Sequence, residues 1–518
     1  MSSGVGRILD PAVAVVPERS ALVLGDRHCG YGELEALVRR VAAALTARGV
    51  GPGTRIALVD TGSVLAVATI LAAARVGAAA AQMNVELTPA ELSALAAAVD
   101  ASVGVAGEPF RQRLAQALGP DAVLGEDDVA GSGVDPAADV GVVGGVGAVA
   151  EVEVADIEPD DEALVLFTSG TTGLPKPISI SHGVVAQRLR FYGTPVDPDA
   201  PPVVGMMSAP IFHIGGTLGL LISLHSGRTT VVLPRFDAGV WLRAVEEHRV
   251  TATFVVPTML QRVLDHPDFR SRDLSSLQQL SYGAAAAPVA LVERALDALP
   301  HVDFMNVFGQ TETLGAYAML SPEDHRQRRK LGSAGKPLPG VELRIVDPAA
   351  GTDCPTGGVG EVWVRAAQNV TTDWLRTGDL ASLDGEGYLH PVGRLSDTIN
   401  RGGEKFGPVE VEEVLRSHPA VRDAGVAGVP DPELGERVGA VVVPVPGVAL
   451  EASELVAYAA TRLARYKLPE RMVLADDLPY SNLGKVSRRA LAAMILERLE
   501  EGGGREGDEG VADDALHA

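Results

Sequence analysis

The stretch that decides the fold runs from residue 163 to residue 176 and reads ALVLFTSGTTGLPK. Its first five residues are apolar and predict a buried strand, which passes directly into a loop rich in glycine and hydroxyl groups. Gly170 and Gly173 let the backbone approach a ligand closely. Four hydroxyls, consecutive N–H groups and Lys176 supply what a polyphosphate requires. A plain surface turn is the alternative, and the spacing excludes a Walker A loop.

Strand-like and helix-like patterns alternate on both sides of this stretch. This alternation predicts an α/β fold with parallel-rich sheets and helices on both faces. The expected strands are 55–60, 103–105, 231–233 and 252–256, and the expected helices are 63–75 and 240–248.

Composition predicts the boundaries between the structural units of the chain. Residues 131–150 are almost entirely Gly, Ala, Val and Asp, and we expect a surface linker joining two α/β subdomains. Rising β content over 336–346 and 358–364 predicts a small antiparallel or β-barrel-like unit. An amphipathic helix at 409–418 begins a small α+β end domain. The predicted domains are therefore 1–394 and 395–498, followed by an acidic, disordered tail at 499–518.

Charge and cysteine content exclude several classes of function. The 518 residues include 44 Lys and Arg against 67 Asp and Glu, a net charge of −23, which argues against nucleic acid or an anionic membrane as partner. Two cysteines cannot build a disulfide framework or a zinc cluster. Residues 203–227 lack Asp, Glu, Lys and Arg, but their Pro, Gly and His residues favour a buried strand–loop–helix over a membrane span. Without a recognisable signal peptide, a cytoplasmic location is expected.

Five further motifs follow along the chain. Each is weak alone, but together they stand in a fixed order: APIFHIGG at 209–216, NVFGQTE at 306–312, TGD at 377–379, GRLSDTINRGGEK at 393–405 and LPYSNLGKV at 478–486. With the phosphate loop, they resemble the signatures of the adenylate-forming superfamily of acyl-CoA synthetases, adenylation domains and firefly luciferase. The resemblance extends from about residue 20 to residue 495.

The resemblance implies a nucleotide site for ATP with Mg²⁺. Phe308 would stack on adenine, Thr311 would contact phosphate, Glu312 would hold the metal, and Asp379 with Arg394 would bind the ribose. Two departures from the family pattern stand out, because Pro177 replaces the usual glycine after the loop lysine and Phe308 replaces the commoner tyrosine. The remaining implied nucleotide contacts are Thr168, Ser169, Gly170, Thr171, Thr172, Gly173, Lys176, Gly283, Ala284, Ala285, Asn306 and Gly309.

The resemblance also implies two half-reactions, in which a carboxylate becomes an acyl-adenylate and the acyl group then passes to the thiol of coenzyme A. Lys485 would bridge carboxylate and phosphate during the first, together with Thr311, Glu312 and His213. For the second, a mobile end domain would turn about a hinge at Ser396, where most relatives have Asp or Lys. The expected coenzyme A contacts are Gly402, Gly403, Arg465 and Lys467.

The acid itself is predicted only by class. Amino-acid-activating relatives carry an Asp near the APIFHIGG motif, and none occurs between Gly205 and Gly219, which favours a non-amino carboxylic acid. An enzyme that stops at the adenylate or delivers it to an acyl carrier protein, and a non-catalytic nucleotide-binding relative, stay open as alternatives, as does a homodimer. The expected walls of the acyl pocket are Met206, Phe212, His213, Ile214, Leu218, Ala286 and Leu314.

Overall fold

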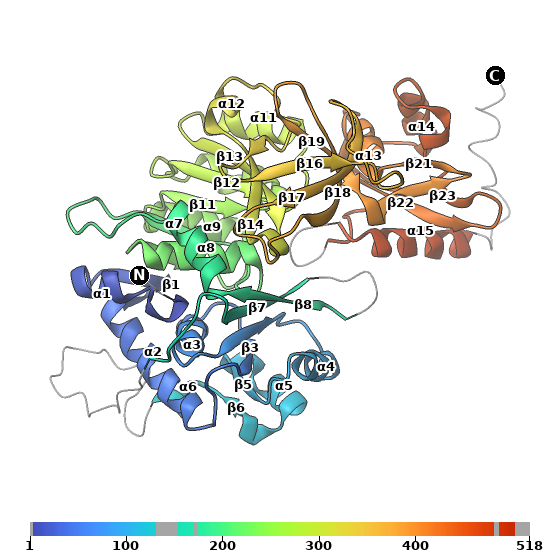
Figure 1. Cartoon of the computed structure of the whole chain (residues 1–518). Helices are drawn as coiled ribbons and strands as arrows, with labels where there is room; N and C mark the ends of the chain where they lie inside the picture. The colour runs from blue at the N-terminus through green and yellow to red at the C-terminus, as the bar shows by residue number, and fades with distance from the viewer. Residues whose placement is uncertain (1–3, 131–153, 169–173, 481–485, 503–518) are drawn as a thin grey trace.

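The computed structural model describes residues 4–130, 154–168, 174–480 and 486–502. The predictions for Ser169 to Gly173, for Lys485, for the linker and for residues 503–518 of the acidic tail lie outside these residues. Residues 499–502, which we expected in the disordered tail, instead form the end of a helix that begins at Arg488. Figure 1 shows two lobes stacked on each other, with the C-terminal part of the chain beside the upper lobe.

The lower lobe is built on a six-stranded sheet with the order β6-β5-β3-β4-β7-β8. All neighbouring pairs are parallel except β7 and β8. Because β6 and β7 lie in the same sheet, the expectation that residues 131–150 join two subdomains is wrong. The strands are β3 (Arg55–Val59), β4 (Ala79–Met83), β5 (Val103–Ala106), β6 (Val123–Leu124), β7 (Glu162–Thr168) and β8 (Lys176–Ser181).

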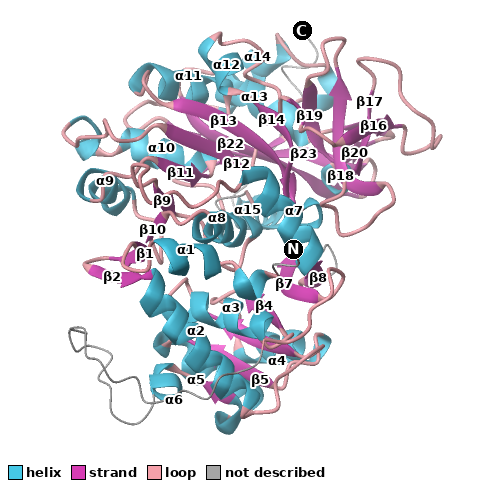
Figure 2. Cartoon of the chain, turned by 60° about the vertical axis from the view of Figure 1, so that its left-hand side comes forward, coloured by secondary structure: helices cyan, strands magenta, loops and turns pink. Residues whose placement is uncertain are grey.

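Helices cover both faces of this sheet, as Figure 2 shows. Residues of α2 and α3 share one core with one face of β3 and β4, and residues of α4 and α5 share a second core with the opposite face. Every residue of α3 is buried, and most are Ala, Val or Leu, so small side chains fill the space between closely packed layers. The helices are α1 (Asp10–Val15), α2 (Tyr31–Thr46), α3 (Val64–Arg75), α4 (Pro89–Ala98), α5 (Glu108–Leu118) and α6 (Glu126–Ala130).

The upper lobe contains a nine-stranded sheet with the order β15-β14-β13-β12-β11-β9-β10-β1-β2. Its six central strands are parallel, and the strands beyond them at both edges are antiparallel. The strands are β1 (Ser20–Leu24), β2 (Arg27–Gly30), β9 (Val204–Met207), β10 (Thr229–Val232), β11 (Ala252–Val255), β12 (Gln279–Gly283), β13 (Asp303–Gln310), β14 (Gly315–Leu320) and β15 (Lys336–Pro337).

One layer of helices lies between the two sheets. The core that contains α2 and α3 continues through α8 to Met207 and Val232 of the nine-stranded sheet, whereas α9, α10 and α11 pack on that sheet's other face. The expected strand–loop–helix at 203–227 is confirmed as β9 and α8, and no helix within the described ranges is long and apolar enough to cross a bilayer. The helices are α7 (His182–Tyr192), α8 (Ile214–His225), α9 (Ala238–Glu247), α10 (Pro257–Asp265), α11 (Val289–Ala298) and α12 (Pro322–Arg326).

The expected small β unit is an antiparallel sheet with the order β16-β17-β18-β19. Its edge strands β16 and β19 are not neighbours, so the sheet is open. Lys336 and Pro337, which we expected in this unit, instead form β15 of the nine-stranded sheet. The strands are β16 (Glu342–Val346), β17 (Val359–Arg365), β18 (Leu375–Leu383) and β19 (Leu389–Arg394).

The C-terminal part of the chain has its own sheet and its own hydrophobic cores. Its strands run in the order β21-β20-β23-β22, with β24 paired to β23, and α13 begins at Pro408 close to the predicted 409–418 helix. The elements are β20 (Ile399–Arg401), β21 (Glu404–Phe406), α13 (Pro408–Arg416), β22 (Val421–Asp431), β23 (Gly435–Pro444), α14 (Ala452–Ala460), β24 (Arg471–Leu474) and α15 (Arg488–Gly502).

Candidate active site

Three of the predicted motifs follow the carboxyl ends of parallel strands in one sheet. The 209–216 motif follows β9, the Gly283 segment closes β12, and the 306–312 motif closes β13. Open α/β sheets bind their ligands at the carboxyl ends of the strands. By contrast, a surface hollow lined by residues 48–55 and 99–103 lies at the amino ends of β3 and β5, and none of the predicted site residues lines it. The candidate site is therefore the edge of the sheet at which the three motifs lie.

The predicted phosphate loop joins β7 to β8 in a hairpin. Thr168 stands opposite Lys176, and Phe167 stands opposite Pro177. Lys176 is exposed as the first residue of β8. Pro177 cannot donate a backbone hydrogen bond, and an edge strand such as β8 is where a sheet tolerates proline. Because proline fixes its own φ, Pro177 restricts the backbone of β8, the strand that leaves the loop.

The turn after β13 depends on glycines that allow close backbone contact. A Cβ atom on Gly283 would lie 2.1 Å from the carbonyl oxygen of Val307, and one on Gly309 would lie 2.0 Å from that of Gly315. The chain reverses where Leu314 has φ 43° and Gly315 has φ 92°. This reversal places Thr311 and Glu312 in a single turn of 3₁₀ helix, and the backbone carbonyl of Glu312 accepts a hydrogen bond from Val370 N at 3.0 Å.

The structure brings together the predicted adenine contact, Phe308, and the two predicted ribose contacts, Asp379 and Arg394. Arg394 Nε donates to Asp379 Oδ1 at 2.9 Å, and the two residues face each other across β18 and β19. Tyr317 Oη donates to Asp379 Oδ2 at 3.4 Å, and its ring meets Phe308 edge-on at 5.3 Å between centroids. Burial and the neighbouring carboxylate raise the pKa of Tyr317 well above its ordinary value, so its hydroxyl stays a donor. Asp379, Arg394 and Phe308 thus meet around a buried tyrosine.

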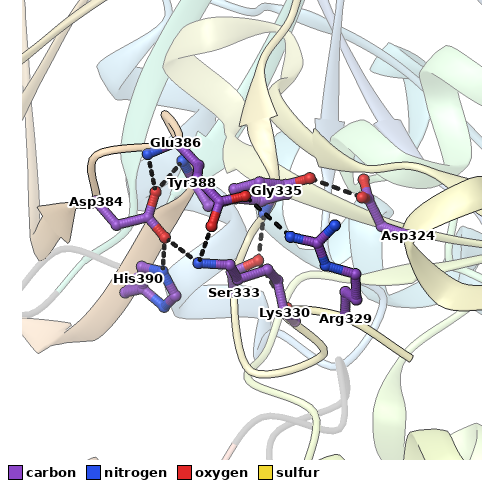
Figure 3. Close-up of polar contacts among 9 residues, drawn as sticks. All are labelled: Asp324, Arg329, Lys330, Ser333, Gly335, Asp384, Glu386, Tyr388 and His390. Atoms are coloured by element: carbon purple, nitrogen blue, oxygen red, sulfur yellow. Dashed lines mark hydrogen bonds and ion pairs between the residues drawn. The ribbon is translucent and has the colours of Figure 1, made fainter. Parts of the chain in front are cut away.

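Polar contacts anchor the β18–β19 hairpin to the loop before β15, as Figure 3 shows. Lys330 Nζ contacts Asp384 Oδ2 at 2.7 Å and Glu386 Oε1 at 3.2 Å, and His390 Nε2 lies 3.0 Å from the same Asp384 oxygen. The hydrogen bond from the Lys330 ammonium is the main reason that the pKa of Asp384 lies well below its ordinary value. The ring of Tyr388 adds contacts with both Lys330 and Lys336, and its hydroxyl donates to Asp324 at 2.7 Å. The network fastens the hairpin that carries Asp379 and Arg394.

The predicted acyl-pocket residues do not all lie on one side of the nine-stranded sheet. Phe212 and Leu314 belong to the core between the sheets, and Ile214 packs against it. Met206 belongs instead to the core beneath α9–α11, because successive side chains of a strand point to opposite faces. Met207, the next residue, belongs to the core that contains α8, and the place of Met206 in the acyl pocket stays a prediction. Leu218 and His213 are partly buried, Ala286 and Ala284 are exposed, and Ala285 is partly buried.

The predicted coenzyme A and hinge residues lie in the C-terminal part of the chain. Gly402 and Gly403, with φ 60° and 97°, form the tight turn between β20 and β21. Lys467 forms an ion pair with Glu410 of α13, so its charge is already matched in this arrangement, whereas Arg465 is exposed. Ser396 is exposed in a 3₁₀ turn directly after β19, and its hydroxyl donates to Asp397 at 2.9 Å.

A magnesium site would draw on Glu312. Within the described part of the chain, no three His, Cys, Asp or Glu side chains cluster in a way that could hold a metal. Mg²⁺ is commonly bound through one or two carboxylates together with substrate phosphates. The partly exposed Glu312, at the carboxyl edge of the sheet, fits such a shared site.

Two residues of this region escaped the sequence analysis. Tyr317 carried a weak signal, because it lies in a strand just after the 306–312 motif, alternating with small residues. Arg188 carried none, since a single arginine in a helix is ordinarily a surface residue. In the structure it is buried and donates to backbone carbonyls of the reversal after Glu312.

Comparison with known proteins agrees with the geometry. The model of the AMP-binding enzyme family matches residues 9–372, and that of the AMP-binding enzyme C-terminal domain matches residues 410–485. A feruloyl-CoA synthase of an Amycolatopsis species is 35% identical, covering 91% of this chain and 94% of the relative. An indoleacetate–CoA ligase of Aromatoleum aromaticum is 32% identical, covering 95% and 98%.

Solved structures agree as well. An o-succinylbenzoate CoA synthetase of Bacillus subtilis, in complex with its acyl-adenylate intermediate, has a TM-score of 0.79 at 29% identity and covers 94% of this chain and 97% of its own. An anthranilate CoA ligase in complex with anthranoyl-AMP has a TM-score of 0.83 at 25% identity and covers 96% and 98%.

Proposed function

This chain belongs to the AMP-binding enzyme family and is an acyl-CoA ligase that works through an acyl-adenylate, and we propose that its acid is a non-amino carboxylic acid bearing a ring. The observation that carries the nucleotide part is the Phe308, Tyr317, Asp379 and Arg394 cluster at the carboxyl edge of the sheet. The partly buried ring of Phe308, packed on the buried Tyr317 beside a carboxylate held by an arginine, suits an adenine ring and two ribose hydroxyls.

The first half-reaction would be a displacement at phosphorus. A carboxylate oxygen of the acid attacks the α-phosphorus of ATP, the bond to the β-phosphate oxygen breaks, and pyrophosphate leaves with the electron pair. Positioning and charge neutralisation carry such a reaction. Lys176, Thr311 and Lys485 would bind the phosphates and the carboxylate. Mg²⁺, when held by Glu312, would neutralise charge on the phosphate oxygens.

The second half-reaction would transfer the acyl group to sulfur. The thiol of coenzyme A loses its proton and attacks the acyl carbonyl carbon, and AMP leaves as the bond to its phosphate oxygen breaks. We assign this step to the domain at 395–498 turning against the domain at 1–394 about Ser396. The glycine turn at Gly402 and Gly403 presents almost no side-chain bulk, which suits the passage of a pantetheine arm.

The ring-bearing acid is inferred from the relatives and from the size of the side chains. Ferulate, indoleacetate, o-succinylbenzoate and anthranilate, the acids in the names of the compared proteins, all contain a ring. In this chain Gly315 carries no side chain where α8 approaches, and a Cβ atom there would lie 3.0 Å from Leu218. The small residues Ala284 to Ala286 follow β12 at the same edge. The contact between Gly315 and Leu218 brings the strand and α8 close together, and the small side chains of Ala284 to Ala286 leave room for a flat, broad acyl group.

The test is a panel of acids with pyrophosphate release measured with and without coenzyme A, and the products identified by mass. Aryl-propenoic, aryl-acetic and benzoic acids should release pyrophosphate and give thioesters, and linear acids of equal carbon number should react more slowly. Lys485→Ala should lose adenylation yet convert supplied acyl-adenylate to thioester, and Glu312→Gln should raise the Mg²⁺ requirement. Faster turnover of the linear acids would overturn the substrate class. Adenylate without thioester would favour the adenylation-only alternative, for which a carrier protein becomes the acceptor to test.

A further inference from the structure

Arg188 is a buried cation close to the candidate phosphate and metal contacts. It lies on α7, and only 3% of its surface is exposed. Its guanidinium donates to the backbone carbonyls of Leu314 at 2.9 Å, Thr313 at 2.9 Å and Ala316 at 2.5 Å. Within the part of the chain that the structure describes, no carboxylate lies within ion-pair distance of it. The ring of Tyr192 lies 5.6 Å from its central carbon.

Burying an arginine without a carboxylate is costly, so the arrangement requires compensation. Desolvation lowers the pKa of Arg188 from its ordinary value. Three carbonyl dipoles and the face of an aromatic ring offset part of this cost. A methionine could fill the same space without the cost of desolvation. This comparison indicates that the guanidinium is present because of the hydrogen bonds that it donates to the three carbonyls.

These carbonyls belong to the reversal that follows Glu312. With Leu314 at φ 43° and Gly315 at φ 92°, the backbone departs from both helix and strand, and it therefore needs hydrogen bonds from outside its own element. Thr313 Oγ1 donates to Gly315 O at 2.6 Å from within the turn, and Arg188 supplies the bonds from without. Because these hydrogen bonds fix the backbone of residues 313–316, they also fix the two residues that precede this segment, Thr311 and Glu312.

The other end of this connection is the phosphate-loop hairpin. Arg188 is the seventh residue of α7, and α7 follows directly on β8, whose first residue is Lys176. In Figure 1, α7 and α8 stand side by side where the two lobes meet. Arg188 thus links α7, the helix that directly follows β8, to the turn that carries Glu312.

We propose that Arg188 is a positioning residue that keeps Thr311 and Glu312 in register with β8 and its first residue, Lys176, so that these groups contact the phosphates and metal of Mg·ATP together. The inference rests on the proposed function, because it takes Glu312 and the hairpin as the two sides of the Mg·ATP site. It assigns Arg188 no contact with the ligand. Adenine and ribose are contacted elsewhere, by Phe308, Asp379 and Arg394, and AMP lacks the β- and γ-phosphates and the metal, so the binding of AMP should depend on Arg188 much less than the binding of Mg·ATP.

The experiment compares the binding of Mg·ATP and of AMP by titration calorimetry in the absence of acid. Arg188→Met should weaken Mg·ATP binding roughly ten- to a hundredfold, the loss expected for charge-assisted hydrogen bonds, and should leave AMP binding within about twofold of wild type. Arg190→Met is the matched control, since Arg190 is exposed on the same helix, and both affinities should be unchanged. Equal losses for AMP and Mg·ATP would overturn the positioning role in favour of general destabilisation.

A double-mutant cycle tests whether Arg188 acts through Glu312. In a Glu312→Gln background, Arg188→Met should have little further effect on the Mg²⁺ concentration needed for half-maximal ATP binding, because residues that act as a unit are not additive. Additive effects would overturn the link. If Arg188→Met does not fold, Arg188→Lys carries the test, since one ammonium cannot reach three carbonyls and should show the same selective loss to a smaller degree.

These outcomes separate the inference from the function on which it rests. A wild-type chain that binds Mg·ATP but releases no pyrophosphate with any acid would refute the proposed reaction, while the comparison of Arg188 variants by binding would still decide the positioning role. A wild-type chain that binds AMP but not Mg·ATP would overturn the inference itself.

Discussion

Asp379 shows at the scale of a residue how a carboxylate is prepared for a ligand. Its oxygens take hydrogen bonds from Arg394 and Tyr317, and its backbone N–H donates to Thr377 Oγ1 at 3.1 Å. Only 6% of its surface is exposed, so the side chain has little freedom to move. A carboxylate oriented in this way is ready to accept hydrogen bonds from two ribose hydroxyls.

Asp379→Asn should therefore weaken AMP binding roughly ten- to a hundredfold, because hydrogen bonds to a charged acceptor are worth about 1.5–3 kcal/mol each. Tyr317→Phe, which keeps the ring against Phe308 and removes only the hydroxyl, should cost less. Calorimetric titration with AMP measures both. An Asp379→Asn titration that superimposes on wild type would remove Asp379 from the ribose site.

His182 predicts a pH dependence of stability. Its Nδ1 accepts a hydrogen bond from Val5 N at 3.0 Å, and burial lowers its pKa to about 4, an effect that nearby Asp161 offsets only in part. The unfolded chain, with an imidazole pKa of about 6.5, binds this proton more readily. Stability from neutral His182 is thus fully present above about pH 6.5 and is lost as the pH falls toward 4.

The measurement is the urea midpoint between pH 4.5 and 7.5 for wild type and His182→Gln, whose amide oxygen can accept the Val5 bond without titrating. The variant should lose less stability on acidification than wild type. His28→Gln, at an exposed histidine, is the control and should behave as wild type. Parallel curves for His182→Gln and wild type would contradict the assignment.

At the scale of an element, the first turn of α8 is held by a close backbone contact. A Cβ atom on Gly216 would lie 2.3 Å from the carbonyl oxygen of Pro210, whereas one on Gly219 in the same helix would meet nothing within 4 Å. The loop that carries Phe212 and His213 thus folds back onto the helix it leads into. The position of α8, and with it one side of the proposed acyl pocket, depends on Gly216.

Replacement by alanine should therefore change the stability of the protein in opposite directions at the two glycines. Gly219→Ala should stabilise by about 0.5–1 kcal/mol, because alanine is the better helix former. Gly216→Ala must displace backbone, and it should lower the thermal midpoint and raise the KM for the acid more than the KM for ATP. Thermal unfolding and steady-state kinetics decide this, and a stabilised Gly216→Ala would show that α8 has room to shift.

At the scale of the whole molecule, the C-terminal unit meets the rest of the chain close to the predicted hinge. A Cβ atom on Gly407, just before α13, would lie 2.3 Å from the carbonyl oxygen of Val392 in β19. Ser396 lies between these two contact points in the sequence and is exposed. Rotation of the end domain requires that this contact open while β19 stays fixed by the network around Lys330 and Asp384.

Ser396→Pro, which locks φ near −65°, should preserve adenylation or thioester formation but not both at the wild-type rate, and thioester formation is the expected loss. Ser396→Ala keeps the backbone freedom, removes only the hydroxyl bond to Asp397, and should retain both. Single-turnover kinetics with ATP plus acid, and with purified acyl-adenylate plus coenzyme A, separate the two steps. Wild-type rates for both steps in Ser396→Pro would place the pivot elsewhere.

Local sequence patterns were enough to predict most of the fold and the positions of the site loops. The strand at 55–60, the helix at 63–75 and the strand that enters the phosphate loop were predictable because elements buried on all sides are continuous apolar runs, and the helix at 240–248 because one buried face gives a repeat of apolar residues. The order of the motifs along the chain likewise named Phe308, Asp379 and Arg394. These are properties of adjacent residues, and they need no knowledge of what packs against them.

Tertiary structure alone decided the rest, because it depends on contacts between distant residues. It placed Met206 on the far face of its sheet, put β6 and β7 in one sheet across the intervening segment, and paired Lys467 with Glu410. It also buried Tyr317 beside Asp379 and Arg188 beneath the turn after Glu312. The chain's sequence determines which chemistry is available, and long-range packing determines which side chains are held in place to perform it.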